Sequence, residues 1–142
     1  MVKSLFFLLL TLCLLSCSDK ATYTRTEMLH MAKNYDPHLE LVIPKDLSSG
    51  VRCVTPGGGP YYGEGCVSAF TVKSGYLDFV ILEFDSEKAA KNEAARLKQF
   101  YTRNWVFDDV SKEPLLEKFV KKAFRAKRAK NISQKESKTQ VE

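Results

Sequence analysis

Apolar positions in the body of the chain predict a small set of strands. The most continuous apolar stretch there, residues 76–84, predicts a central strand that is covered on both faces. The turn residues Ser74 and Gly75 predict a hairpin with a preceding strand over 66–73. Shorter strands are predicted over residues 39–43, 51–54 and 105–107.

Three helices are predicted around these strands. A capping-box pattern predicts the first over residues 25–33. The second follows the cap Asp85-Ser86 and covers about 87–102, and the last begins within 111–114. The predicted buried stripes of the second and third helices are, in turn, Ala90, Ala94, Leu97 and Tyr101, and Leu116, Phe119, Val120, Ala123 and Phe124.

The order of the elements, α–β–β–β–β–α–β–α, predicts one α+β domain over residues 24–126. A length of 142 residues also favours a single domain. We expect a small mixed sheet with helices packed on one face, of ferredoxin-like or α/β-plait type. The strand–helix–strand unit over 76–109 would be a right-handed crossover if its two strands were parallel.

The N-terminal residues differ from the rest of the chain. Lys3 is followed by an apolar run over residues 5–15. That run matches the hydrophobic region of a signal peptide and is shorter than the roughly 20 residues that span a bilayer. A buried helix is the alternative, but the run is apolar on every face and ends at Ser16, a small residue, followed by Cys17.

The segment Leu14-Leu15-Ser16-Cys17 resembles the lipobox of bacterial lipoprotein precursors. The resemblance implies that residues 1–16 are a signal peptide, that the Cys17 thiol receives a diacylglyceryl group, and that the new amino terminus is acylated, for example with palmitate. Residues 17–23 would then be a tether to membrane lipid, and no other cofactor is expected. Two or more acyl chains anchor a protein stably. By resemblance to enterobacterial sorting, Ser18 favours the outer membrane, with the domain facing the periplasm.

The positive charge of the chain is concentrated at its C-terminal end. The whole chain has a net charge of +5, but eight basic and two acidic residues over 121–142 give that segment +6, whereas residues 18–120 carry −2. Residues 127–142 are therefore predicted to be a basic disordered tail. It is either a solvated end or a contact with an anionic surface through Lys127, Arg128 and Lys130. No aromatic residues are interleaved with these charges, which argues against nucleic acid.

Two cysteines, Cys53 and Cys66, remain after the N-terminal segment is set aside. In an oxidising compartment two cysteines usually pair, so a disulfide is expected, with free buried thiols as the alternative. No metal site is expected, because no histidine has finger spacing from them. The bridge would close a glycine-rich segment that carries Tyr61 and Tyr62. That segment is either a stapled connection or a recognition loop with two aromatic rings.

Catalytic motifs are hard to find in the chain. His30 and His38 are its two histidines, and His30 is expected to be structural. Asp108 and Asp109 either cap the loop into the last helix or act as an acidic pair that binds a cation or does acid–base work. Neither a nucleophile elbow nor a phosphate-binding glycine motif is present. We therefore expect that this protein is not an enzyme, and we assign no catalytic residue.

The leading expectation is a membrane-anchored, periplasm-facing lipoprotein of the bacterial cell envelope. It would act as a small binding or assembly module for an unidentified envelope protein. An inhibitor or immunity-type lipoprotein that blocks an envelope-directed enzyme is the alternative. A small enzyme that uses His38, Asp108 and Asp109 is the second alternative.

Overall fold

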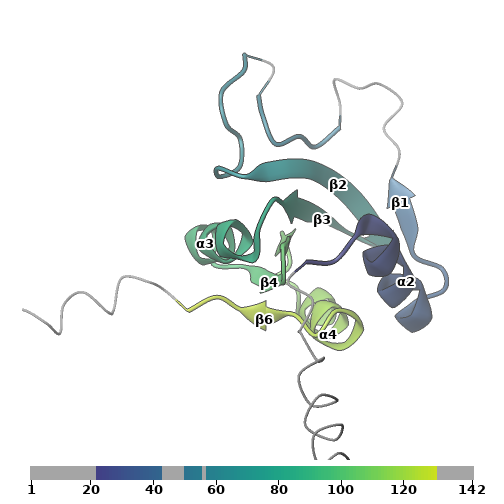
Figure 1. Ribbon diagram of the computed structural model, residues 1–142. Helices are drawn as coiled ribbons and strands as arrows, with labels where there is room; N and C mark the ends of the chain where they lie inside the picture. Colours follow the sequence, from purple (N-terminus) through teal and green to yellow (C-terminus); the bar gives the residue numbers. More distant parts are fainter. Residues whose placement is uncertain (1–21, 43–49, 56, 131–142) are drawn as a thin grey trace, which may run out of the picture.

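The computed structural model describes residues 22–42, 50–55 and 57–130 of the 142-residue chain. This part contains three helices and six strands (Figure 1). In chain order they are α2 (Arg25–Tyr35), β1 (Glu40–Val42), β2 (Cys66–Ser74), β3 (Leu77–Phe84), α3 (Glu87–Leu97), β4 (Phe100–Thr102), β5 (Trp105–Asp108), α4 (Pro114–Ala123) and β6 (Lys127–Arg128). Among these residues, none of the helices has the length and apolar character that crossing a bilayer requires.

The strands form one sheet in the order β1-β2-β3-β5-β4-β6, and every neighbouring pair is antiparallel. The predicted α+β class and the hairpin between β2 and β3 are confirmed, whereas the sheet is antiparallel and not mixed. Helix α3 joins β3 to β4, which run in the same direction with β5 between them. The condition for a direct crossover over 76–109, that its two strands are parallel, is therefore not met, because β3 and β5 are antiparallel. The ferredoxin-like or α/β-plait type is not confirmed. Elements β3 to β6 follow its β-α-β-β-α-β order, but α3 and α4 pack on opposite faces of the sheet, whereas that type has both helices on one face.

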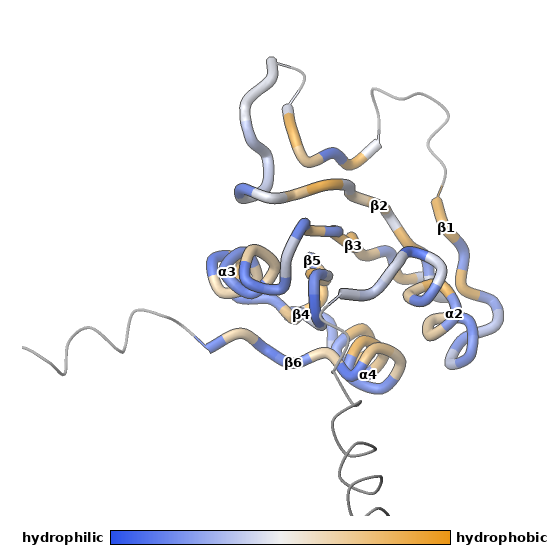
Figure 2. The backbone as a smooth tube through the Cα atoms, viewed as in Figure 1, coloured by the Kyte–Doolittle hydropathy of each residue, from blue (hydrophilic) through white to orange (hydrophobic). Residues whose placement is uncertain are grey.

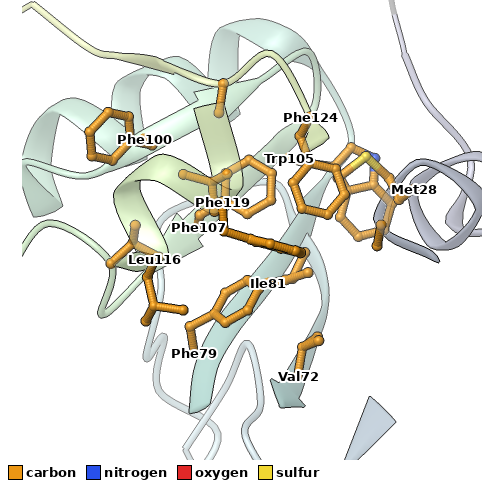
Figure 3. Packing of buried hydrophobic residues seen from close by; sticks show 14 of the residues in the cluster. Met28, Val72, Phe79, Ile81, Phe100, Trp105, Phe107, Leu116, Phe119 and Phe124 are labelled. Carbon is orange, nitrogen blue, oxygen red and sulfur yellow. The ribbon is translucent and has the colours of Figure 1, made fainter. Parts of the chain in front are cut away.

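Helices cover both faces of the sheet, which corrects the expectation of a single covered face. Side chains of β3 alternate between two cores, with Phe79 and Ile81 on one side and Val80 and Leu82 on the other. Helices α2 and α4 pack on the first core, whose aromatic side chains are shown in Figure 3. Helix α3 packs on the second core through its small residues. The prediction that β3 is buried on both faces is confirmed.

Two predicted elements differ from the structure. The helix predicted over 87–102 ends at Leu97, because Lys98 adopts a left-handed conformation with φ of 57° and residues 100–102 form β4 instead. Tyr101 still packs with the small residues of α3, although from a strand. Of the strand predicted over 51–54, the described part of the chain retains one isolated bridge between Val54 and Pro60.

Both predicted ends of the domain extend further than residues 24–126. At the N-terminal end, the Tyr23 N–H donates to Asn104 Oδ1 at 2.8 Å, and its carbonyl accepts from Trp105 Nε1 at 2.8 Å. At the C-terminal end, β6 pairs with β4 and Ala129 is buried. Residues 127–130 are thus part of the domain and not a disordered tail. The rest of the predicted tail, 131–142, lies outside the described residues.

The distribution of hydropathy follows this architecture. Figure 2 shows apolar positions gathered along the central strands and α4, while α2 and α3 carry many hydrophilic positions. Helix α3 buries small residues, Ala90 and Ala94, against the sheet. The segment that precedes β2 also contacts α3, because the Gly63 N–H donates to Glu93 Oε1 at 2.9 Å.

Candidate functional site

The segment that precedes β2 is closed by the predicted disulfide. Cys53 and Cys66 are bridged, with an S–S distance of 2.03 Å and 13 residues of sequence separation. The N–H groups of Tyr61 and Tyr62 both donate to the Cys53 carbonyl, at 2.9 and 3.2 Å. Thr55 and Gly59 close the tip, since the Thr55 N–H donates to the Gly59 carbonyl at 2.7 Å. The disulfide and these backbone bonds therefore constrain the described residues of this loop, 53–55 and 57–66.

The two adjacent tyrosines of the loop have different roles. Tyr61 is 63% exposed, whereas Tyr62 is 6% exposed and belongs to the core on the α3 face. Their rings meet edge to face with centroids 5.0 Å apart. The Tyr62 hydroxyl donates to Asp108 Oδ2 at 3.2 Å. The expectation that both rings are available for recognition is therefore wrong for Tyr62, whose ring anchors the loop.

A second anchor of the loop is a buried carboxylate on α3. Glu93 is 3% exposed and accepts the Gly63 N–H at Oε1, at 2.9 Å. Arg96 donates to the same carboxylate twice, from Nε at 2.7 Å and from Nη2 at 2.6 Å. A Cβ added at Gly63 would lie 2.6 Å from Glu93 Oε2, so a larger residue there would displace the Glu93 carboxylate. We call the six residues Tyr61, Tyr62, Gly63, Glu93, Arg96 and Asp108 the loop site.

Sequence analysis missed Glu93 and Arg96. A signal for Glu93 exists, because it occupies a position on the stripe of α3 that otherwise holds small or apolar residues. A carboxylate on a buried stripe requires a partner, and an arginine three residues later is the natural one. Asp108 was noticed in the sequence, but its partner Tyr62 lies 46 residues earlier and no spacing links them.

The electrostatics of the loop site follow from burial and these bonds. Burial raises the pKa of Asp108, and the neighbouring charges of Asp109 and Glu93 act in the same direction. Burial acts on Glu93 too, but the bonds from Arg96 and Gly63 outweigh it and hold the Glu93 pKa below its ordinary value. Burial and the charge of Asp108 raise the pKa of Tyr62 well above its ordinary value. Tyr62 is therefore a neutral donor throughout the physiological range.

The exposed side of the loop site is a shallow groove. Its described lining residues are Pro60, Tyr61, Tyr62, Gly63, Glu64 and Arg96. The guanidinium of Arg96 is paired with Glu93, and its side chain is still 57% exposed. An exposed aromatic ring and a guanidinium held in fixed positions are the residue types enriched in protein-binding surfaces. The groove can therefore contact a partner that offers apolar and acidic groups.

The basic candidates lie at another place in the fold. Lys127 and Arg128 are exposed in β6, where the Lys127 Nζ lies 5.4 Å from the ring centroid of Tyr101. Arg128 pairs with Glu117 at 3.3 Å and lies over the ring of Phe100 at 5.0 Å. Lys130, also exposed, follows directly. Lys127 and Arg128 thus cover the rings of Tyr101 and Phe100 in β4. This contact gives both side chains a structural role, in addition to any contact with anions.

The proposed catalytic group is not assembled. His38 is exposed and precedes β1, at one edge of the sheet, while Asp108 ends β5. Three strand spacings, about 14 Å, separate β1 from β5. The exposed Asp109, with φ of 59°, lies in the turn toward α4. Within the described ranges, no cluster of three or more His, Cys, Asp or Glu side chains is arranged to hold a metal ion.

Comparison with known proteins adds no relative. The chain matches no protein-family model, no curated protein and no solved structure. The predicted lipidation residue, Cys17, lies outside the described residues. We therefore infer function from the lipobox-like motif at Cys17 and from the geometry of the loop site.

Proposed function

We propose that this protein is a lipid-anchored component of the bacterial cell envelope, whose α+β domain faces the periplasm and binds another envelope component. The observation that carries the binding proposal is the exposed Tyr61, which lines one groove with Arg96. Tyr61 lies on a loop that is closed by a disulfide and held on the domain by the Tyr62–Asp108 and Gly63–Glu93 bonds. The anchoring proposal depends on the lipobox-like segment that ends at Cys17.

Support for the loop as a binding surface comes from its preorganisation. A loop that is ordered only on binding loses conformational entropy at that moment, and this loss weakens affinity. Here the disulfide, the Tyr62–Asp108 bond and the Gly63–Glu93 bond order the loop in the free protein. Tyr61 therefore presents a large amphipathic ring at low entropic cost, as tyrosines of antibody loops do.

Support for the anchor comes from the short distance between Cys17 and the domain. Five residues separate Cys17 from Tyr23, whose N–H donates to Asn104 Oδ1 of the domain. The chain from Cys17 to Tyr23 can span at most about 20 Å. A domain held that close to a membrane would present its loop to other components of the same surface. The disulfide agrees with export, because disulfides persist in oxidising compartments.

The binding proposal is tested by site-specific photo-crosslinking in intact envelopes. A benzophenone amino acid replaces Tyr61 in one strain and Tyr76, a more exposed tyrosine in the turn of the β2–β3 hairpin, in the control strain. We expect a discrete adduct from position 61 that is absent from position 76 and that weakens when Arg96 is replaced by Ala. The same adducts from both positions, or none from position 61, would contradict the loop as the contact.

The anchoring proposal has a separate test. Mass spectrometry of the native protein should show a mature chain that begins at Cys17 and carries acyl groups. Cys17→Ser should leave the uncleaved precursor or a protein that washes off membranes in high salt. A mature amino terminus at any other residue would contradict the assignment, whatever the crosslinking result.

The shape of the loop also favours a second candidate, an inhibitor of an envelope-directed enzyme. In Figure 1 the segment that precedes β2 projects away from the sheet. A rigid projecting loop can enter an active-site cleft with little entropic loss. The adduct from position 61 separates the two candidates, because an inhibitor would crosslink to residues that line a catalytic cleft and would lower that enzyme's activity when purified.

A further inference from the structure

A second feature of the molecule lies on the opposite face, where α2 crosses the sheet. A cavity of about 140 Å³ opens there, and side chains from α2 and from the four strands β1, β2, β3 and β5 line it. Its inner wall consists of apolar groups. Among them are Ala32 and five residues that Figure 3 labels, Met28, Val72, Ile81, Trp105 and Phe124. Because these groups come from elements that are far apart in the sequence, the cavity belongs to the folded domain and not to one mobile loop.

The rim of the cavity combines apolar and charged groups. Leu29 and Leu41 line the cavity and are also exposed, so both lie at its mouth. Arg25 is the charged residue among the described lining residues, and its side chain is 59% exposed. Its guanidinium lies over the ring of Phe70, 5.2 Å from the centroid. The site is therefore an apolar chamber with a guanidinium at its entrance.

The hydrogen bonds of Arg25 leave it able to bind an anion. Its Nε donates to Glu83 at 2.7 Å and its Nη2 to Ser68 at 3.2 Å. A guanidinium has five N–H donors, so these two bonds use less than half of them. Arginine binds carboxylates through paired donors, and such charge-assisted bonds are stronger than neutral ones. The entrance thus offers free N–H donors to a carboxylate, next to the ion pair that Arg25 forms with Glu83.

The volume of the cavity limits the size of the occupant. Engineered apolar cavities of about 150 Å³ stay dry and bind benzene, which has six carbon atoms. A chamber of about 140 Å³ therefore accommodates about six carbons of a hydrocarbon chain. A chain of about eight carbons would place its carboxylate at the mouth, beside Arg25. We propose that this cavity binds a medium-chain fatty acid, with its alkyl chain inside and its carboxylate on Arg25.

The single tryptophan of the chain gives this proposal a specific readout. Trp105 lines the cavity, and its Nε1 is fixed on the Tyr23 carbonyl at 2.8 Å. Octanoate, titrated into the full chain below its micelle concentration, should change the Trp105 fluorescence in a saturable way. Octanol, which has the same chain without the charge, should bind at least tenfold more weakly. A linear, unsaturable response to octanoate would overturn the proposal.

Two variants separate the chamber from its entrance. Arg25→Leu should lower octanoate affinity at least tenfold and leave octanol affinity unchanged. Ala32→Leu places a larger side chain in the chamber and should abolish the response to both ligands. If Ala32→Leu lowers the thermal midpoint strongly, Arg25→Leu carries the test by itself, because Arg25 is largely exposed. Equal weakening of both ligands by Arg25→Leu, or wild-type binding by a folded Ala32→Leu, would contradict the proposal. These binding measurements do not depend on whether Cys17 is lipidated, so they test the cavity separately from the proposed anchor.

Discussion

The hydroxyl of Tyr62 donates a hydrogen bond to Oδ2 of Asp108 at 3.2 Å, across 46 residues of sequence. This bond joins the disulfide-closed loop to the last residue of β5. The same tyrosine packs in the core on the α3 face. Tyr62 therefore links the conformation of the loop to the stability of the whole domain, and its neighbour Tyr61 does not.

Substitution of the two tyrosines should separate these roles. Tyr62→Ala removes a buried ring and should lower the free energy of unfolding by about 3–5 kcal/mol. Tyr62→Phe keeps the ring and loses the bond to Asp108, which should cost about 0.5–1.5 kcal/mol. Tyr61→Ala removes an exposed ring and should change stability by less than about 0.5 kcal/mol. Denaturant unfolding measures all three, and equal effects of Tyr61→Ala and Tyr62→Ala would contradict the burial of Tyr62.

The raised pKa of Asp108 predicts a pH dependence of stability. Because burial raises this pKa, the native state holds the proton more tightly than the unfolded state does. The contribution of Asp108 to stability is therefore present at low pH and is lost as the pH rises through the raised pKa. Asn at this position cannot titrate. The free energy of unfolding of the wild type minus that of Asp108→Asn should fall as the pH rises from about 3 to about 7.

A matched control for this experiment is Asp109→Asn. That substitution removes a neighbouring charge that raises the Asp108 pKa, and it leaves the Asp108 carboxyl able to titrate. In the Asp109→Asn background, the contribution of Asp108 to the free energy of unfolding should therefore still fall as the pH rises, but by less than in the wild type. If the difference between wild type and Asp108→Asn rises with pH, the native carboxylate is stabilised, and the assignment of the raised pKa is wrong.

The contact between Gly63 and Glu93 predicts opposite effects for two glycine substitutions in one loop. Gly63→Ala introduces a Cβ 2.6 Å from the Glu93 carboxylate, which Arg96 and the Gly63 N–H hold in place. We expect a loss of about 1–3 kcal/mol. Gly57→Ala meets no atom closer than 4.0 Å and should be neutral or stabilise by up to about 1 kcal/mol. Thermal unfolding of both variants, with hydrogen exchange of the residue 63 amide, measures the difference.

Some features of this fold can be predicted from the sequence and others cannot, depending on their physical origin. The apolar run of β3 and the stripe of α4 were predicted because burial imposes a regular period on them. Strand β4 was missed because Tyr101 continues the helical spacing of α3, and because Lys98 takes the left-handed cap position that glycine usually occupies. Adjacent loop residues follow no period. Sequence therefore could not show that Tyr61 is exposed and Tyr62 buried.

The loop site was predictable only in part for a related reason. The disulfide and the two tyrosines were identified from residue type and compartment. Glu93 and Arg96 were missed because charged residues on a helix are normally solvated, and only the packing of the loop on α3 makes the Glu93 carboxylate buried. A function that depends on contacts between distant segments is thus less visible in a sequence than the fold is.

The position of β6 makes the last prediction, which concerns the basic C-terminal end. Truncation after Lys130 keeps every described contact and should leave the free energy of unfolding unchanged within about 0.5 kcal/mol. Truncation after Ala126 removes β6 and the buried Ala129, and it uncovers the Phe100 and Tyr101 rings that Arg128 and Lys127 cover. Because backbone bonds and cation–π contacts are both lost, we expect a decrease of about 2–4 kcal/mol.

A double substitution, Lys127→Ala with Arg128→Ala, separates the two contributions to that loss. It keeps the β6 backbone and the buried Ala129 while it removes both cations, so it should cost less than truncation after Ala126. Denaturant unfolding of the two truncated proteins and the double variant ranks their free energies of unfolding. If truncation after Ala126 leaves stability unchanged, β6 adds nothing to the domain, and residues 127–130 belong to the tail as the sequence first indicated.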